Sequence, residues 1–251
     1  GGNGGVIAMD AGGRIVVDSG TLRLTNSART DWTANLASLT VNAGATLDLF
    51  DSGIDVDAAY SFTDTNVYID ALDGGGLITR TATNLANNTN PNTGSLVMGV
   101  NNTNGNFTGL ISSLRGTTNL EKTGTGTQVI AGSGITIGTG TVLVDDGTLQ
   151  IGDGTTNTAL VSGTVTNNAQ LVINRLAAVP EVIDGIATIQ AQAFDGTGDM
   201  TIVQSGGIRF MSSVAQDQII IEDTAENRTI EFGGQTLIAT GLTVDAGTAA
   251  Y

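Results

Sequence analysis

Apolar and polar residues alternate along most of this chain, in short runs separated by glycine-containing turns. The run Ile15–Leu24 (IVVDSGTLRL) is typical, because two alternating segments enclose a turn at Ser19 and Gly20. Alternation with a period of two places successive side chains on opposite faces of a β-strand, so each run predicts strand, turn and strand. No segment keeps apolar residues at helical spacing over three turns. The pattern therefore predicts an all-β protein.

The same strand–turn–strand pattern recurs at short intervals. Val41 follows Val17 by 24 residues, and Thr166 follows Val144 by 22. A unit of about 20–24 residues accommodates three short strands and their turns, and such a short period is typical of a solenoid. We therefore predict one domain over residues 1–251, a right-handed parallel β-helix (β-solenoid) of about 11 rungs. The recurring copies are Ile15–Leu24, Leu39–Leu49, Val142–Ile151, Val165–Ile173, Thr201–Phe210 and Leu242–Ala250.

Two segments depart from this repeat. Residues 81–106 are rich in asparagine and contain Pro91, which predicts long polar loops, or asparagine ladders at the corners, around a strand at Ser95–Val100. Residues 175–183 (RLAAVPEVI) contain no glycine, and we expect a lateral loop or a bulging strand there. Binding residues concentrate on loops that a rigid scaffold presents. The interaction candidates are Asn87, Asn101, Asn106, Arg175 and Pro180.

The most specific motif lies in residues 107–152. It reads Leu-x-Lys-Thr-Gly-x-Gly from residue 120, and Gly-Thr-Leu-x-Ile from residue 147. This motif resembles the autotransporter-associated β-strand repeat, which is found in the passenger regions of bacterial autotransporters. The resemblance implies a β-helix outside the cell and gives the motif residues a structural role rather than a catalytic one. These residues are Leu120, Lys122, Gly124, Gly126, Gly147, Leu149 and Ile151.

Lys122 is the only lysine of the chain. One hypothesis makes it an isopeptide or partner contact. The other makes it a corner residue whose aliphatic stem covers apolar surface, as long charged side chains commonly do.

Composition excludes several classes of function. The chain has nine basic and 24 acidic residues, a net charge of −15, so it repels nucleic-acid phosphates and anionic lipids. It contains no histidine and no cysteine, which removes the usual nucleophile–base pairs and the best transition-metal ligands. No apolar run approaches the roughly 18–20 residues of a membrane helix. We therefore expect no nucleic-acid partner and no membrane insertion.

Carboxylates are the remaining candidate chemistry. Asp-Gly turns offer hard oxygen ligands for Ca²⁺, the one possible cofactor. The calcium candidates are Asp73, Asp146, Asp153 and Asp195. A polysaccharide-acting β-helix enzyme would need paired carboxylates on neighbouring rungs. Its candidates are Asp55, Asp57, Asp70, Asp145 and Asp146, but aromatic platforms for a sugar are scarce, since only 4% of the residues are aromatic.

The sequence thus favours a non-enzymatic structural or adhesive β-helix, a stalk or passenger segment of an autotransporter-like surface protein. We expect it outside the cell or on the bacterial cell surface, where it meets a host or neighbouring-cell surface. The alternative is a self-assembling subunit of an extracellular filament or sheath, in which copies of the chain stack end to end. A polysaccharide-acting enzyme is the third hypothesis.

Overall fold

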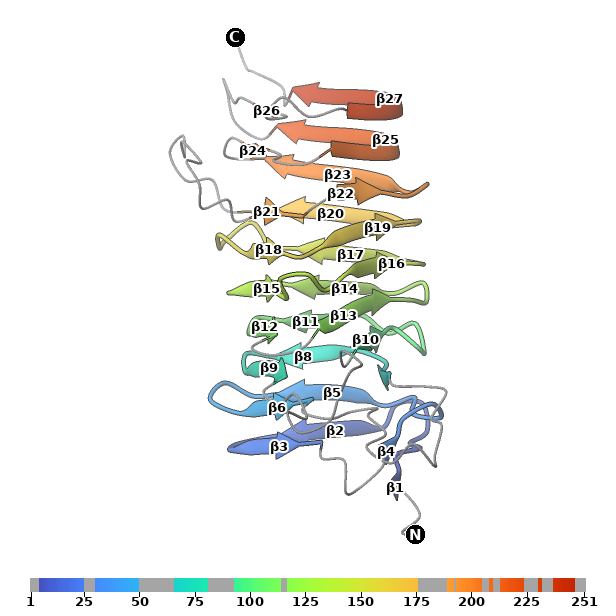
Figure 1. Ribbon diagram of the computed structural model, residues 1–251, viewed down its shortest axis with the longest axis vertical. Helices are drawn as coiled ribbons and strands as arrows, with labels where there is room; N and C mark the ends of the chain where they lie inside the picture. The colour runs from blue at the N-terminus through green and yellow to red at the C-terminus, as the bar shows by residue number, and fades with distance from the viewer. Residues whose placement is uncertain are drawn as a thin grey trace, which may run out of the picture.

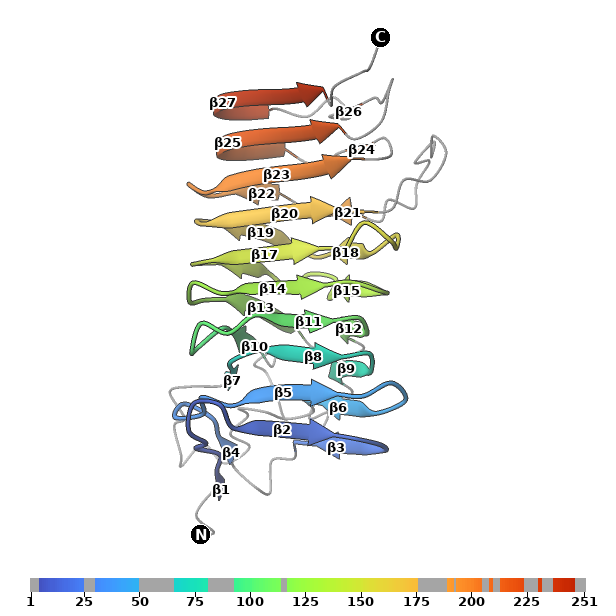
Figure 2. The same ribbon diagram turned by 180° about the vertical axis from the view of Figure 1, so that it is seen from behind.

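The computed structural model is a stack of β-strands, shown from two sides in Figures 1 and 2. The described residues form strands and turns, and they form no helix. The prediction of an all-β parallel solenoid is therefore confirmed, whereas the count of about 11 rungs stays a prediction. The structure describes residues 5–24, 30–49, 66–80, 93–113, 117–175, 189–191, 193–204, 208–209, 213–223, 230–231 and 237–246.

The strands of each coil fall on three faces, and every pairing between described coils is parallel. On the first face, strands β7, β10, β13, β16, β19 and β22 pair in that order. Two further strands, β1 and β4, precede them in the chain and pair with each other. The bounds are β1 Gly5–Val6, β4 Thr30–Asp31, β7 Val67–Ile69, β10 Thr93–Met98, β13 Thr117–Lys122, β16 Val142–Val144, β19 Thr164–Asn167 and β22 Ala193–Asp195.

The second face is the longest series of paired strands. It runs from β2 to β23, and each strand pairs with the equivalent strand of the next coil. The bounds are β2 Arg14–Val17, β5 Ser38–Val41, β8 Leu72–Gly74, β11 Gly105–Phe107, β14 Thr127–Ile130, β17 Thr148–Ile151, β20 Gln170–Asn174 and β23 Asp199–Gln204.

The third face is a separate seven-stranded sheet, and two short strands, β24 and β26, pair with each other beyond it. The bounds are β3 Thr21–Arg23, β6 Thr46–Asp48, β9 Leu77–Arg80, β12 Leu110–Ser113, β15 Gly134–Thr136, β18 Ala159–Val161, β21 Ile189–Gln190, β24 Ile208–Arg209 and β26 Ile230–Glu231.

The first and second faces merge at one end of the stack. β25 (Ser213–Asp223) and β27 (Leu237–Ala246) are long enough to cover both faces. β25 pairs with β22 through its first residues and with β23 through its last ones. β27 pairs with β25 and lies at the opposite end of the stack from β2 and β3 (Figure 1).

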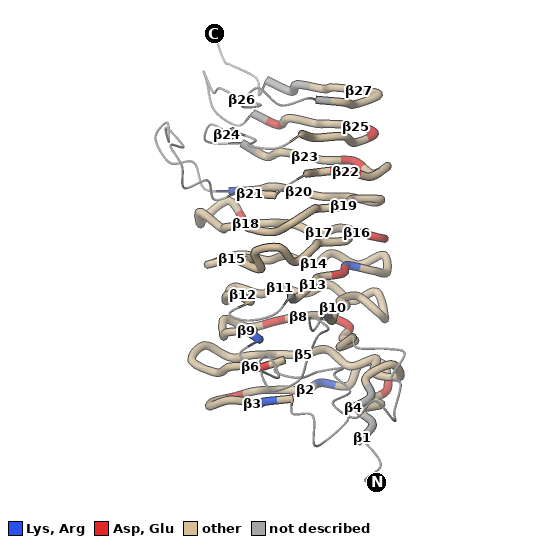
Figure 3. Tube along the Cα trace, in the orientation of Figure 1, with Lys and Arg blue, Asp and Glu red and all other residues tan. Residues whose placement is uncertain are grey.

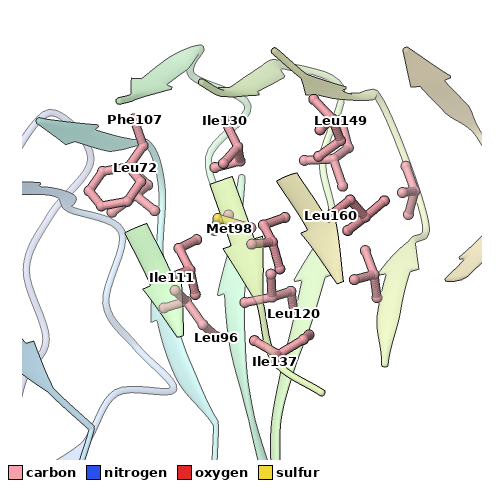
Figure 4. Packing of buried hydrophobic residues seen from close by; sticks show 14 of the residues in the cluster. Leu72, Leu96, Met98, Phe107, Ile111, Leu120, Ile130, Ile137, Leu149 and Leu160 are labelled. Atoms are coloured by element: carbon pink, nitrogen blue, oxygen red, sulfur yellow. The ribbon is translucent and has the colours of Figure 1, made fainter. Parts of the chain in front are cut away.

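The core is built from files of inward-facing side chains that stack on the same position of the next coil (Figure 4). On the first face, one file contains Leu96, Leu120 and Val142, all buried. We call the corresponding file of the second face the inner file. Parallel strands in register place like residues over one another, so aliphatic side chains fill the narrow interior. The inner file contains Ile15, Leu39, Leu72, Gly105, Gln128, Leu149, Leu171, Met200, Ile219 and Leu242.

Coil lengths follow from the register. Leu120 pairs with Leu96 and Val142 pairs with Leu120, so these coils contain 24 (120 − 96) and 22 (142 − 120) residues, within the predicted range. Leu39 pairs with Leu72, 33 residues on (72 − 39), and Val165 pairs with Phe194, 29 residues on (194 − 165). Residues 50–65 and 176–188 lie inside these longer coils. Extra length is therefore confined to particular coils while the register is kept.

The recurring sequence unit occupies two different corners. The copy Ile15–Leu24 forms β2 and β3, which lie on the second and third faces. The copy Val142–Ile151 forms β16 and β17, which lie on the first and second faces. Each corner needs the same chemistry, two strands around a glycine-containing turn, so the pattern does not identify the face. The copies of the sequence unit therefore do not all occupy the same position in a coil, which differs from the prediction of one recurring structural unit.

Candidate functional site

Lys122 lies in the corner between the first and second faces. It ends β13, and its side chain is 1% exposed. Its ammonium group donates to the carbonyl oxygens of Thr123 and Gly124, each at 2.6 Å, and to that of Asp146 at 3.2 Å. An ammonium group has three donors, and here each has an acceptor. The side chain therefore ties its own turn to the turn of the next coil.

Glycines make the space that this ammonium group occupies. A Cβ atom at Gly99, in the preceding coil, would lie 3.1 Å from Lys122 Nζ. A Cβ atom at Gly147, in the following coil, would lie 2.9 Å from it. Gly124 approaches the preceding coil even more closely, because its Cβ would lie 2.1 Å from the Gly99 carbonyl oxygen. The Lys-Thr-Gly-x-Gly motif thus combines one buried cation with turns that have no side chain.

Burial lowers the pKa of Lys122 below its ordinary value of 10.5, and the negative charges of Asp146 and Asp70 oppose that shift. Asp70 is itself buried, and its carboxylate accepts the N–H groups of Asn101 and Thr103 at 3.0 and 3.1 Å. The corner therefore contains charged groups that bond to backbone atoms of several coils.

The other motif residues also have structural positions. Leu120, Leu149 and Ile151 are buried in the core files. Gly126 packs against the preceding coil, where a Cβ atom would lie 2.6 Å from the Asn102 carbonyl oxygen. Among the described hydrogen bonds of Lys122, none goes to a carboxylate side chain with which it could form an isopeptide bond. The corner hypothesis for Lys122 fits its surroundings.

The sequence did not predict a second buried polar interaction, the hydrogen bonds of the Gln128 side chain. Gln128 belongs to the inner file, where Gly105 lies between it and Leu72. The Leu72 N–H donates to Gln128 Oε1 at 3.0 Å, and Gln128 Nε2 donates to the Leu72 carbonyl at 2.9 Å. The side-chain amide of Gln128 thus gives the Leu72 N–H and carbonyl the hydrogen bonds that a peptide group of a neighbouring strand would otherwise make. A Cβ atom at Gly105 would lie 2.3 Å from Gln128 Oε1, so this bridge requires glycine.

A similar arrangement recurs around Gly196. Gln216 Nε2 donates to the Asp195 carbonyl at 2.8 Å, and its Oε1 accepts from Asn167 Nδ2 at 2.6 Å. Asn167 and Gln216 are both buried, and Gly196 lies between them in the stack. Both bridges lie at the end of a longer coil, where the chain begins to pair again with the preceding coil. A glutamine at an expected core position is the signal that could have revealed them.

Asparagine side chains join neighbouring coils at the surface. Asn102 Oδ1 accepts the Thr125 N–H at 2.8 Å, and Asn104 Oδ1 accepts the Thr127 N–H at 2.7 Å. Asn119 Oδ1 accepts the Thr141 N–H at 3.0 Å. Each bond satisfies a backbone donor where the chain turns and the ladder is interrupted. The asparagine-rich sequence up to residue 106 therefore includes residues that connect coils; residues 81–92 lie outside the described part of the chain.

The four calcium candidates lie in separate turns. Asp73 accepts the Asn106 N–H at 3.0 Å, Asp146 accepts the Gly147 N–H at 2.7 Å, and the Asp195 carbonyl accepts from Gln216. Asp153 accepts the N–H and hydroxyl of Thr155, and these bonds lower the pKa of its carboxyl below the usual 3.8. Within the described ranges, no three acidic side chains gather to hold a metal ion. The carboxylates of Asp73, Asp146 and Asp153 accept hydrogen bonds from backbone N–H groups.

The interaction candidates have different fates. Asn106 is exposed and Asn101 is partly exposed, whereas Arg175 is only 8% exposed and so presents little surface to a partner. Asn87 and Pro180, like the enzyme candidates Asp55 and Asp57, lie outside the described residues. The described Asp and Glu residues are spread over many coils (Figure 3). Among the five enzyme candidates, only Asp70, Asp145 and Asp146 can be placed, and they lie at the Lys122 corner.

Comparisons of the chain with models of protein families, with curated proteins and with solved structures found no match. The search for a membrane-spanning helix, made over the described ranges, also found none. The geometry of the corners is thus the main basis for a functional proposal.

Proposed function

We propose that this chain is a non-enzymatic structural segment, a stalk or adhesive passenger, of an extracellular bacterial surface protein. The observation that carries the proposal is the cross-linking of coils by buried polar side chains. Lys122 bonds to a backbone carbonyl of the next coil, and Gln128 bonds to backbone groups of a coil two positions away, in addition to the parallel ladders of the three faces. A stack of coils that is joined both at its faces and at its corners resists local opening.

The composition supports an exposed, extracellular role. The chain contains no cysteine, so its stability is independent of the redox state of the compartment. Its net charge of −15 keeps a long β-surface soluble. The resemblance of its Lys-Thr-Gly-x-Gly motif to the autotransporter-associated repeat supports a location outside the cell. The partner in this proposal is a host or neighbouring-cell surface.

Antibody labelling of intact cells of the source bacterium tests the location directly. We expect an antibody against the purified chain to label intact cells as strongly as permeabilised ones. Labelling that requires permeabilisation would contradict the proposal. A cytoplasmic marker protein, stained in parallel, controls for the integrity of the cells.

A further inference from the structure

Asn106 begins a tripeptide that can accept an N-linked sugar. The acceptor tripeptide, or sequon, reads Asn-x-Ser/Thr, where x is any residue except proline. The chain contains four sequons, which begin at Asn87, Asn101, Asn106 and Asn227. Asn101 and Asn106 belong to the described residues, whereas Asn87 and Asn227 lie outside them. The structure therefore allows the sequons of Asn101 and Asn106 to be compared.

The Asn106 sequon is extended, and its acceptor points away from the core. Asn106 is the middle residue of β11, where it is exposed between the buried residues Gly105 and Phe107. Because side chains alternate across an extended chain, Thr108 follows on the same outer side, and it is exposed as well. The amide that would be modified and the hydroxyl that completes the sequon thus lie on one face of the molecule.

The side-chain amide of Asn106 makes no hydrogen bond to any described residue, although its backbone N–H donates to Asp73 at 3.0 Å. Other asparagines of this region use their side chains to join coils. Asn102, Asn104 and Asn119 each accept a backbone N–H of the following coil, and none of them begins a sequon. The asparagines that connect coils are therefore distinct from the one whose amide is left for another partner.

The Asn101 sequon has a different shape. Its middle residue, Asn102, has a positive φ of 66°, so this tripeptide forms a turn. The N–H groups of Asn101 and Thr103 both donate to the buried carboxylate of Asp70, and Asn101 is only partly exposed. This turn is thus folded around a buried charge. Of the two described sequons, that of Asn106 presents its acceptor more fully.

We propose that Asn106 is an N-glycosylation site whose co-substrate is a sugar activated as a diphosphate ester. In the transfer, Asn106 Nδ2 forms a bond to the anomeric carbon of the sugar and gives up a proton to a base of the transferase. The bond between the anomeric carbon and the diphosphate oxygen breaks, and the diphosphate leaves with the electron pair. The inference rests on the proposed extracellular role, because sequons are modified in exported proteins.

The position of β11 in the stack determines when the sugar is added and where it lies. β11 pairs with β8 on one side and with β14 on the other, so the transferase meets this segment as a free chain, before these coils close. After folding, the sugar lies on the outer side of the second face, beside the partly exposed residues Asp73 and Val129. A bulky, hydrophilic group therefore covers this part of the rod.

Mass spectrometry of the protein isolated from the surface of the source bacterium tests the site. Trypsin, used after denaturation, cuts behind Arg80 and Arg115 and releases residues 81–115 as one peptide. We expect this peptide to carry a glycan, and fragmentation that keeps the glycan attached to place it on Asn106. The same chain made in a bacterium without N-glycosyltransferases supplies the unmodified reference peptide.

Two substitutions of Thr108 separate the acceptor sequence from the fold, since both leave Asn106 unchanged. Thr108→Val keeps the branched shape but removes the sequon hydroxyl, and should abolish the glycan at Asn106. Thr108→Ser keeps the hydroxyl and should be modified like the wild type. If Thr108→Val fails to fold, Asn106→Gln replaces it, because this exposed position accepts a longer amide that cannot serve as the acceptor.

An unmodified 81–115 peptide, from protein that an antibody labels on intact cells, would overturn this inference and leave the proposed location standing. A glycan attached only at Asn87 or Asn101, or one that persists on Asn106 in Thr108→Val, would overturn it as well. Absence of the protein from the cell surface would instead contradict the proposed function. In that case the same peptide, prepared from whole cells, would still decide whether Asn106 is modified.

Discussion

At the scale of single residues, the structure shows polar side chains that act as backbone groups inside an apolar solenoid. Lys122 and Gln128 are both buried, and each bonds to at least two backbone carbonyls. Buried polar groups of this kind stabilise a fold only when all their partners are in place. The glycines beside them are part of the same arrangement, because they leave the room that the long side chains need.

Replacement of the Lys122 ammonium group tests its role. We expect Lys122→Met to lower the free energy of unfolding by about 2–4 kcal/mol, because three carbonyls in two turns lose a charged donor while the cost of burying the charge is relieved. Urea denaturation followed by circular dichroism measures this change. Thr136→Ala alters an exposed position and should change the free energy by less than about 0.5 kcal/mol. A Lys122→Met variant as stable as Thr136→Ala would contradict a stabilising role for the hydrogen bonds of Lys122.

The pH dependence of the same residue has a defined sign. The folded pKa of Lys122 lies below its ordinary value of 10.5, so the unfolded chain holds this proton more tightly. The contribution of Lys122 to the free energy of unfolding therefore rises as pH increases through the interval below 10.5 and is constant at lower pH. Comparison of wild type with Lys122→Met between pH 7 and pH 10.5 should show the difference growing with pH. A difference that shrinks would contradict the assigned shift.

The amide bridge of Gln128 is the second test at this scale. We expect Gln128→Leu to cost about 2–4 kcal/mol, because the buried N–H and C=O groups of Leu72 each lose their partner. Gln150→Leu is the control, since Gln150 lies on the neighbouring strand, is only partly buried and faces outward. Equal stability of the two variants would contradict the bridge.

At the scale of elements, turns determine which residues the repeat can tolerate. Gly124 and Gly138 both have positive φ, +64° and +61°. A Cβ atom at Gly124 would lie 2.1 Å from a backbone oxygen of the preceding coil, whereas at Gly138 it would meet nothing within 4 Å. The same backbone conformation therefore has different consequences in a corner that touches the next coil and in one that does not.

This difference predicts a ranking of two alanine variants. Gly138→Ala should cost only the backbone strain of a left-handed residue, about 1–2 kcal/mol. Gly124→Ala should cost about 1–3 kcal/mol more, because the turn must also move away from the Gly99 carbonyl. Thermal unfolding of both variants measures the ranking. A Gly124 variant that is as stable as the Gly138 variant would show that the turns do not touch as described.

Much of the fold could be predicted from the alternation of apolar and polar residues. The inward positions of β14, β17 and β20 follow directly from that alternation. The face that each strand occupies could not be predicted, because the Ile15–Leu24 and Val142–Ile151 copies have the same chemistry at different corners. The role of Lys122 was one of two hypotheses, since a motif names a residue but not its acceptors. The Gln128 bridge depends on a contact 56 positions away along the chain, which short-range patterns do not contain.

At the scale of the whole molecule, three parallel faces and their corners form one continuous rod of coils (Figures 1 and 2). Each coil contacts mainly its two neighbours, so stability is the sum of coil and interface contributions. Coils of 22 and 33 residues keep the same register, so the described ladders accommodate coils of different length. Such a rod fits the stalk role that we propose.

Resistance to proteolysis tests the central claim, a stack locked at its faces and corners, most directly. The purified chain would be digested with proteinase K or thermolysin, and the fragments identified by mass spectrometry, with a urea-unfolded sample as the reference. We predict that residues 117–175, which contain Lys122, Gln128 and the strands from β13 to β20, survive as one uncut fragment long after the unfolded sample is degraded. Cleavage within residues 117–175 at a rate close to that of the unfolded chain would contradict the account.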